Sequence, residues 1–144
     1  MPQNAKPETV MILAVDDEPA NNELVQRVFR SRPGYEVVSC MSAAEGLDVL
    51  KQRQVDVLLV DYSMAEMNGV ELAERVAVVA PGTIIIVVTA YPDVKAVFQA
   101  HKAGLVTFIV AKPWTPDDLI GAINRALSVR AMRQAVGELQ GLNK

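Results

Sequence analysis

Hydrophobic residues gather in five short runs along the chain, and the segments between these runs are amphipathic. Three runs, at 10–15, 55–60 and 83–88, are nearly continuous in Val, Ile and Leu. Such runs are typical of strands that are buried on both faces of a parallel sheet. Together with two further runs, at 35–40 and 105–110, the pattern predicts five strands.

The segments between the runs show helical spacing, and their ends carry helix signals. Ser42 with Glu45 forms a capping box, and Thr115 followed by Pro116 is a strong helix start. Strict alternation of strands and helices predicts an α/β domain, a doubly wound five-stranded parallel sheet with helices on both faces. The apolar stripes of the first four helices are Leu24, Val25, Val28 and Phe29; Ala43, Leu47 and Leu50; Leu72, Ala73 and Val76; and Val94, Val97 and Phe98.

The fifth helix is predicted to extend further than docking on the sheet requires. It starts near Pro116, and the next breakers that we expect to end it are Gly137 and Gly141. Two heptads are too few to establish a coiled coil. We therefore consider three interpretations of residues 131–144: a solvated helical tail, a dimer seam, and a rigid linker to an output domain. The apolar spacing continues into this extension at Val129, Met132, Val136 and Leu139.

Composition narrows the class of protein. A length of 144 residues corresponds to one domain, and 51% hydrophobic with 22% charged residues is ordinary for a globular chain. The formal net charge of −3 gives this segment no electrostatic basis for binding nucleic acid directly. The only cysteine, Cys40, and the only histidine, His101, exclude Cys-rich zinc sites and His-rich metal sites.

The N-terminal residues 1–9 are polar and contain two prolines, so they do not have the pattern of a signal peptide. We expect them to form a flexible tail. The longest apolar runs, such as 84–88, are the length of a strand, far short of the ~20 residues that cross a bilayer. We therefore expect a cytoplasmic protein that does not contact a membrane.

Chemically active side chains follow four of the predicted strands. Asp16 and Asp17 follow the first strand, Asp61 the third, Thr89 the fourth and Lys112 the fifth. Ligands of open α/β sheets bind outside the carboxyl ends of the strands, so these side chains should meet at one edge. Three neighbouring carboxylates repel one another, and a hard divalent cation that prefers oxygen ligands, Mg²⁺, relieves that repulsion.

A carboxylate is also a competent nucleophile toward phosphorus, with which it forms an acyl phosphate. Mg²⁺ and a lysine ammonium can offset the negative charge of the phosphoryl oxygens, and a threonine hydroxyl can donate a hydrogen bond to one of them. Each residue alone has a simpler explanation: a helix N-cap for Asp16 or Asp17, a turn for Asp61, a backbone bond for Thr89 and a solvated Lys112. The combination favours a site that holds a phosphoryl group on an aspartate.

Four sequence segments, in this order, carry a resemblance to a known family: MILAVDDEP, VDVLLVDYSMAEMNG, IIIVVTAYPD and AKPW. Together they resemble the receiver domain of bacterial two-component response regulators, over residues 10–130. The resemblance implies a flavodoxin-like (βα)5 fold. It also implies that Asp61 is the phosphoacceptor and that Asp17 binds Mg²⁺ directly. Asp16 would act through water or as a second acid, and the backbone carbonyl of Ser63 would be a further metal ligand.

The same resemblance assigns roles to residues after the fourth and fifth strands. Thr89 matches the switch hydroxyl that moves toward the phosphate, and Lys112 matches the lysine that pairs with it. Pro113 follows in a peptide bond that is usually cis in this family. Tyr91 matches a position that tunes autodephosphorylation, and its bulk leads us to expect that it shields the acyl phosphate from water.

The chain departs from the family pattern at two places. Met64-Ala65 stands where the family usually has Met-Pro. The aromatic switch residue of the family is replaced by Ile109, one position after Phe108, and the segment 104–112 is one residue longer than usual. A β-bulge in the fifth strand could absorb the extra residue and place Phe108 in the aromatic role.

The resemblance implies a signalling switch and not an enzyme, apart from self-phosphorylation and autodephosphorylation. A sensor histidine kinase or a phosphotransfer protein would phosphorylate Asp61, and the face made by the fourth helix, fifth strand and fifth helix would then change. That face would control a partner or a tethered output domain. A homodimer could form through the same face or through the C-terminal helix.

Two other functions fit the sequence less well. A Mg²⁺-dependent phosphatase with an aspartate nucleophile would need Asp-x-Asp and a substrate cap, whereas Asp16 and Asp17 are adjacent and the chain is short. A flavodoxin-like redox module would not place three acids where a flavin phosphate binds. For the output, the KPW segment resembles receivers joined to HD-GYP cyclic-di-GMP phosphodiesterases. Both a stand-alone receiver and the N-terminal part of a longer regulator stay open.

Overall fold

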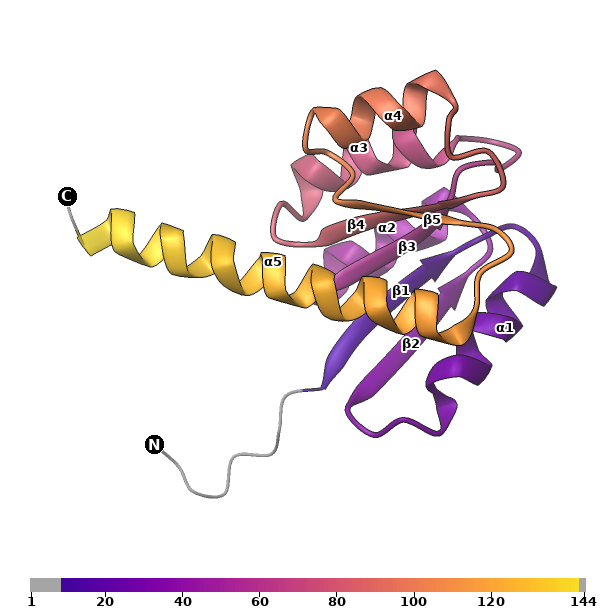
Figure 1. Cartoon of the computed structure of the whole chain (residues 1–144), viewed down its shortest axis with the longest axis horizontal. Helices are drawn as coiled ribbons and strands as arrows, with labels where there is room; N and C mark the ends of the chain where they lie inside the picture. The colour runs from indigo at the N-terminus through magenta and orange to yellow at the C-terminus, as the bar shows by residue number, and fades with distance from the viewer. Residues whose placement is uncertain (1–8, 143–144) are drawn as a thin grey trace.

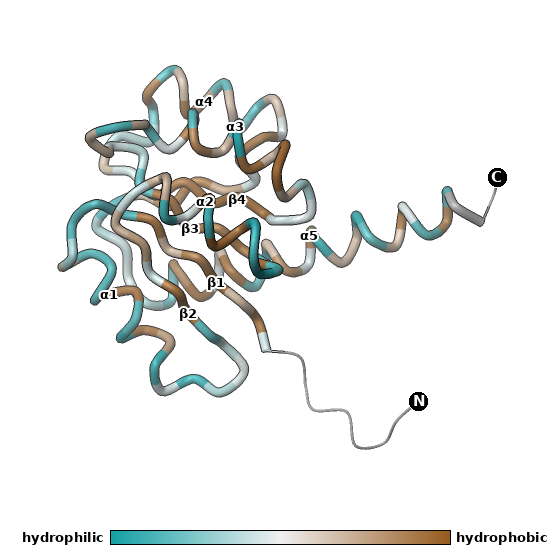
Figure 2. Tube along the Cα trace, turned by 180° about the vertical axis from the view of Figure 1, so that it is seen from behind, coloured by the Kyte–Doolittle hydropathy of each residue, from teal (hydrophilic) through white to brown (hydrophobic). Residues whose placement is uncertain are grey.

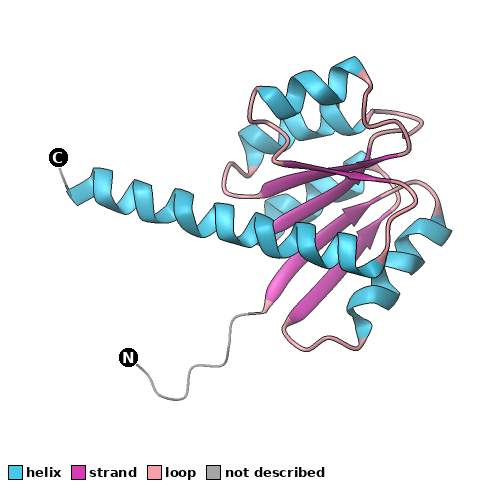
Figure 3. Ribbon diagram, in the orientation of Figure 1, coloured by secondary structure: helices cyan, strands magenta, loops and turns pink. Residues whose placement is uncertain are grey.

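The computed structural model describes residues 9–142, which form five strands and five helices in strict alternation (Figure 1, Figure 3). The fold is the flavodoxin-like α/β architecture that the sequence predicts. The strands are β1 (Val10–Val15), β2 (Tyr35–Cys40), β3 (Val57–Asp61), β4 (Ile84–Thr89) and β5 (Phe108–Ala111). The helices are α1 (Pro19–Arg30), α2 (Ala43–Gln52), α3 (Gly69–Val79), α4 (Lys95–Lys102) and α5 (Pro116–Leu142).

All neighbouring strands pair in parallel, in the order β2-β1-β3-β4-β5. Successive side chains of a strand point to opposite faces, so each strand contributes to two cores. Leu13 and Leu58 pack with α2, α3 and α4 on one face, whereas Ile12 and Leu59 pack with α1 and α5 on the other. Figure 2 shows the hydrophobic strands running between the two helical layers.

The helix ends follow the local signals in the sequence. Ser42 Oγ accepts a hydrogen bond from the Glu45 N–H at the start of α2, at 3.2 Å. At the start of α5, Thr115 Oγ1 accepts from the Asp118 N–H at 3.1 Å, and the Asp118 carboxylate accepts from the Thr115 N–H at 2.9 Å. These reciprocal bonds satisfy N–H groups that have no partner within the helix.

The predicted strand bounds need correction, above all for β5. The run at 105–110 predicted a strand that begins at Leu105, but β5 begins at Phe108. The N–H groups of Leu105 and Val106 instead donate to the Ala100 carbonyl and close the end of α4. Gly104, at φ +82°, makes the turn that this closure requires. The third and fourth strands likewise begin and end one or two residues later than the runs at 55–60 and 83–88 predicted.

The helix α5 runs through both Gly137 and Gly141, where the sequence predicted an end. Its first turns are buried through Leu119, Ile123 and Ala126, and its C-terminal half projects beyond the sheet (Figure 1). Tertiary packing of the first half holds the helix in place. A glycine further along lowers the local helix propensity but does not end the helix.

A polar clamp holds α5 at the point where it leaves the domain. Arg130 Nη1 lies 2.7 Å from Asp56 Oδ1, and Arg130 Nε donates to the Gly82 carbonyl at 3.2 Å. The second oxygen of Asp56 accepts a hydrogen bond from the Met11 N–H at 2.8 Å. These bonds join α5 to the edge of the sheet opposite to the carboxyl ends of the strands.

Three further sequence predictions concern Cys40, membrane-spanning segments and the N-terminal tail. Cys40 is buried, as a small hydrophobe would be, and burial together with the negative charge of Glu45 raises the pKa of its thiol. None of the helices within residues 9–142 combines the length and apolarity needed to cross a membrane. The expected N-terminal tail lies almost wholly outside the described residues.

We predict that Leu58→Ala lowers the free energy of unfolding by about 2–5 kcal/mol, because Leu58 is fully buried at the centre of the sheet. The matched control is Leu24→Ala, at a leucine that is 47% exposed, where we expect a loss below about 1 kcal/mol. Urea titration followed by circular dichroism measures both. Equal losses for the two variants would contradict the described core.

Candidate functional site

The parallel register brings the ends of four strands to one level. Val15 of β1 pairs with Val60 of β3, so the next residues, Asp16 and Asp61, emerge side by side. On the other side of β3, Thr89 ends β4 and its carbonyl accepts a hydrogen bond from the Lys112 N–H at 2.9 Å. The acids, the hydroxyl and the lysine predicted from the sequence thus occupy one edge of the sheet.

Lys112 connects two of the acids. Its Nζ lies 2.8 Å from Asp61 Oδ1 and 3.8 Å from Asp16 Oδ2, and both carboxylates are buried. A short ion pair in a partly desolvated site is stronger than the same pair on the surface. The ammonium therefore acts here as a cation shared by two carboxylates.

The ionisation of Asp61 reflects this crowding. Burial raises the pKa of the Asp61 carboxyl above its ordinary value, although the hydrogen bond and the positive charge of Lys112 act in the opposite direction. The negative charges of Asp16 and Asp17 raise this pKa further. The three acids therefore repel one another, and an additional cation would reduce that repulsion.

Asp17 makes its contact away from the other two acids. Its Oδ2 accepts a hydrogen bond from the backbone N–H of Ala65 at 3.0 Å, across to the loop that follows β3. Ser63, whose carbonyl was predicted to ligate the metal, lies exposed in the same loop. Asp16 in turn accepts a hydrogen bond from the Glu18 N–H at 2.9 Å through Oδ1.

The Thr89 hydroxyl forms a hydrogen bond with the backbone, which is the non-functional role that the sequence analysis considered for it. Its buried Oγ1 accepts a hydrogen bond from the Tyr91 N–H at 3.0 Å. The Tyr91 residue is 66% exposed, so its expected role in shielding an acyl phosphate stays a prediction. The peptide bond between Lys112 and Pro113 is cis, as the resemblance implied.

One buried polar residue of the site was missed by the sequence analysis. The Asn22 side chain donates to the carbonyls of Asp16 at 3.0 Å and Cys40 at 3.2 Å, and it thereby joins the ends of β1 and β2. The sequence does contain a sign of this buried role. Asn22 lies three positions before Val25 and seven before Phe29, so it is a polar residue on the apolar face of the first helix.

Comparison with known proteins decides the family. A model of the response regulator receiver domain matches residues 12–124. The chain belongs to the response regulator receiver family. It is 37% identical over 120 residues to the transcriptional regulatory protein GlrR of Escherichia coli (strain K12), covering 83% of this chain and 27% of that regulator. The chain thus spans about a quarter of the length of the curated regulators that it matches first.

Two further similarities concern proteins of the receiver's own size. Over 120 residues, the chain is 27% identical to sporulation initiation phosphotransferase F of Bacillus subtilis (strain 168), with 83% of this chain and 95% of that protein covered. The crystal structure of the signal receiver domain of an HD domain-containing protein from Pseudomonas fluorescens Pf-5 superposes with a TM-score of 0.80 at 26% identity. That alignment covers 87% of this chain and 99% of the other.

The two candidates for the aromatic switch position lie on opposite faces of the receiver. Ile109 packs with the core beneath α3 and α4, whereas Phe108 packs toward α5, with the Arg125 guanidinium 5.8 Å from its ring centre. The expected β-bulge is wrong, because Phe108 to Ala111 pair with β4 residue by residue. Ile109 therefore lies on the face of β5 that packs toward α4.

The receiver's donor atoms suit Mg²⁺ by their chemistry. The carboxylates of Asp16, Asp17 and Asp61 and the carbonyl of Ser63 supply only oxygen, and the Lys112 ammonium already stands between two of the acids as a cation. Within the described part of the chain, no three His, Cys, Asp or Glu side chains form a group ready to hold a metal ion.

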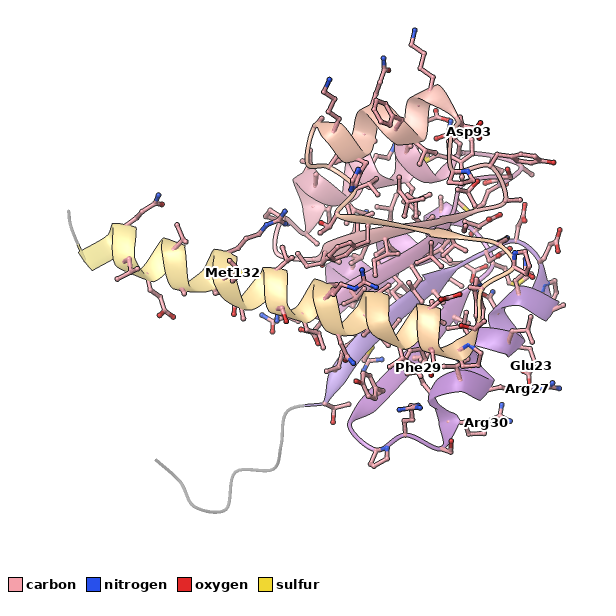
Figure 4. The ribbon with its side chains drawn as sticks, in the orientation of Figure 1. Glu23, Arg27, Phe29, Arg30, Asp93 and Met132 are labelled. Carbon is pink, nitrogen blue, oxygen red and sulfur yellow. The ribbon has the colours of Figure 1, made fainter. Side chains whose placement is uncertain are left out.

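An apolar groove borders the receiver's acidic site. It measures about 630 Å³ and lies between α1 and the segment that follows β5, where Leu24, Val28, Lys112, Pro113 and Trp114 are among its lining residues. Figure 4 shows Glu23 and Arg27 of α1 pointing outward, and Arg27 is itself among the residues that line the groove. A protein that reaches Asp61 from this side meets an apolar surface with a charged rim.

Gly69 shapes the opposite side of the receiver site. It begins α3 directly behind Asp61, and its N–H donates to the Tyr62 carbonyl at 2.9 Å. A Cβ at this position would lie 2.8 Å from the Asp61 carbonyl oxygen. The sequence analysis identified a helix start here but not this close approach of two backbone segments.

We predict that Gly69→Ala lowers the free energy of unfolding by about 1–3 kcal/mol, because the added methyl group meets backbone that cannot move aside cheaply. Gly82→Ala is the control, since a Cβ there has no neighbour within 4 Å, and we expect a change within about 0.5 kcal/mol. Thermal unfolding of both variants provides the comparison. A fully stable Gly69→Ala variant would show that the approach is looser than described.

Proposed function

We propose that the receiver is a phosphorylation-dependent switch in which Asp61 accepts the phosphoryl group. The observation that carries this proposal is the 2.8 Å contact between Asp61 and Lys112, in a buried site that also holds Asp16. A lone buried carboxylate would be neutralised by protonation, whereas here a fixed ammonium keeps it ionised and nucleophilic. The raised pKa of Asp61 adds basicity to the attacking oxygen.

In the proposed reaction, an Asp61 oxygen attacks phosphorus and forms a P–O bond while the bond from phosphorus to the donor's histidine nitrogen breaks. The electron pair of that bond leaves with the imidazole. Lys112 Nζ follows the new charge to a phosphoryl oxygen, because its Asp61 partner has lost its negative charge. Receiver domains generally use Mg²⁺ for this reaction, and Asp16, Asp17, Asp61 and the Ser63 carbonyl are the residues that we propose to hold it. The ion would offset the charge of the phosphoryl oxygens.

The proposed donor is a sensor histidine kinase or a phosphotransfer protein in the cytoplasm, where ATP is available to charge it. Such a donor has to bring a phosphohistidine within bonding distance of Asp61. The apolar groove beside Lys112 and Trp114 offers it a surface directly at the site. Half-exposed Leu24 on α1 gives that surface an apolar side chain whose burial on docking is favourable.

The proposed output passes through the face formed by α4, β5 and α5. Phe98 on α4 is largely exposed and Phe108 on β5 is half-buried, so the face presents apolar surface to a partner. An output domain beyond residue 144 is the second part of this proposal, and an HD-GYP phosphodiesterase is one candidate. The similarity to the receiver of an HD domain-containing protein supports that candidate.

A Mg²⁺-dependent phosphatase is the alternative, and the contacts of the acids disfavour it. Such an enzyme needs a second acid free to exchange a proton with a substrate. Asp16 and Asp17, which follow β1, accept hydrogen bonds from Glu18 and Ala65. We therefore propose a switch that at most phosphorylates and dephosphorylates itself.

Incubation with Mg²⁺ and acetyl phosphate should add the mass of one phosphoryl group to the wild-type chain, because Asp61 is the buried nucleophile of the site. Asp61→Ala should gain none, and Lys112→Ala should gain less, since the ammonium no longer offsets the phosphoryl charge. Intact-mass spectrometry measures the three proteins.

The control for this experiment is His101→Ala, which removes the only histidine of the chain and should be phosphorylated like the wild type. His101 is exposed on α4, away from the acids. A phosphoryl group on Asp61→Ala, or its loss from His101→Ala, would contradict the assignment of the phosphoacceptor.

We further propose that the projecting part of α5 pairs with a second copy of the chain. Met132, Val136 and Leu139 are 68%, 52% and 61% exposed, and their spacing places them on one face of the helix. Figure 4 shows Met132 on the part of α5 that extends past the sheet. Short helices are marginal in water, and Gly137 within this one lowers its stability by about 1 kcal/mol. A second helix that covers the apolar face would compensate for this.

The charges along the seam permit a parallel pair. With Met132 and Leu139 at equivalent positions of successive heptads, the flanking residues Ser128 and Arg133 of opposite helices face each other, so no like charges meet. The clamp of Arg130 on Asp56 fixes the direction in which both helices leave their domains.

Sedimentation velocity over a range of concentrations tests the pairing. The wild-type chain should shift toward the dimer as concentration rises, and Met132→Glu should remain monomeric because it places a charge in the seam. Gln134→Glu is the matched control on another face of the helix and should behave as the wild type does. A wild-type chain that stays monomeric, or a Met132→Glu variant that still dimerises, would rule out this seam.

A further inference from the structure

The loop after β3 reaches across the site and binds the acid that follows β1. Ala65 donates its backbone N–H to Asp17 Oδ2 at 3.0 Å, a contact between residues 48 positions apart. We propose that this hydrogen bond is a latch, which holds the Asp17 carboxylate against the loop and has to open before Asp17 can bind Mg²⁺. The inference rests on the proposed function, because it concerns the same metal site.

The orientation of the three acids carries the argument. Each has a different hydrogen-bond donor: Glu18 N–H for Asp16, Ala65 N–H for Asp17 and Lys112 Nζ for Asp61. In this arrangement the described residues contain no group of three acids that could hold a cation. The bond from the Ala65 N–H directs Asp17 Oδ2 toward the loop. In the proposed latch, Asp17 leaves Ala65 and turns toward the other two acids when it binds the ion.

The surroundings of the latch allow it to open. Ala65 is exposed, and a cavity of about 110 Å³ next to it is lined by Asp17 and by the flexible side chains of Met41, Met64 and Met67. The loop is held at both ends: the Tyr62 N–H donates to the Val88 carbonyl at 3.0 Å, and the Asn68 capping box and the bond from Gly69 to Tyr62 start α3. A shift of the residues around Ala65 would leave both the sheet and α3 in place.

Mg²⁺ would open the latch because it attracts the Asp17 carboxylate more strongly than the Ala65 N–H does. The backbone N–H offers Asp17 a partial positive charge, whereas the ion offers two full charges to all three acids at once. The hydrogen bond is lost when the ion binds, so its free energy is subtracted from the binding free energy. The latch thus weakens the binding of Mg²⁺ and sets the concentration at which the site fills.

The latch donor is a backbone N–H, so proline is the substitution that removes it. Ala65→Pro should bind Mg²⁺ about three- to tenfold more tightly than the wild type, the range that one exposed hydrogen bond accounts for. The fluorescence of Trp114, the only tryptophan of the chain, provides the titration signal, because its side chain lines a cavity with Asp61 and Lys112. Ala65→Gly, which keeps the N–H, is the matched control and should bind Mg²⁺ as the wild type does.

A second measurement uses the wild-type chain and does not depend on the folding of a variant. Amide hydrogen exchange, followed by NMR, should show that the Ala65 N–H exchanges faster when Mg²⁺ saturates the site, because its acceptor has turned away. The neighbouring Gly69 N–H, which donates to Tyr62, should keep its exchange rate.

The outcomes separate the latch from the proposed function. Equal or weaker Mg²⁺ binding by a folded Ala65→Pro variant, or unchanged exchange of the Ala65 N–H, would overturn the latch and leave the metal site standing if the wild type binds Mg²⁺. Failure of the wild type to bind Mg²⁺ at all would overturn both.

Discussion

Parallel pairing of β1, β3, β4 and β5 is the constraint from which the rest of the molecule follows. Hydrogen bonds between parallel strands fix their register, and here the register sets Val15 beside Val60 and Thr89 beside Ala111. Residues that are far apart in the chain therefore emerge together at the carboxyl edge. The apolar side chains on both faces of these strands hold the register, because a slip of one residue would exchange the two cores.

Charge crowding at this edge is tolerated because each acid has a donor of its own. Lys112 supplies an ammonium to Asp61, and backbone N–H groups serve Asp16 and Asp17. Burial, and after it the negative charges of Asp16 and Asp17, raise the pKa of Asp61, so the site retains an unfavourable energy that a cation can release.

The opposite edge of the sheet anchors α5. Arg130, Asp56 and the Met11 backbone form a chain of hydrogen bonds there, and α5 leaves the domain from this point. The chemistry at the carboxyl edge and the exit of the long helix are thus separated by the full length of the strands. The helix α5 packs against β3, β4 and β5, so a change at Asp61 can reach the projecting helix through this packing.

The sequence by itself determined the fold class, the family and the residues of the acidic site, because buried strands, helix caps and the four family segments are all local patterns. It also predicted that Cys40 would be buried. The limits of β5 and the length of α5 were decided by tertiary structure. Leu105 and Val106 are as apolar as a strand, yet their N–H groups close α4, and packing of the first half of α5 overrides the glycines of its second half.

The finer geometry of the site also depended on the folded chain. No local pattern indicates that the Ala65 N–H meets Asp17, that Asn22 joins two strand ends or that Gly69 touches the backbone of Asp61. Each of these contacts joins segments that are distant in sequence or spans two backbones. The sequence specifies which chemical groups are present, whereas only the folded structure decides which donor each acid receives, because a hydrogen bond depends on distance and direction.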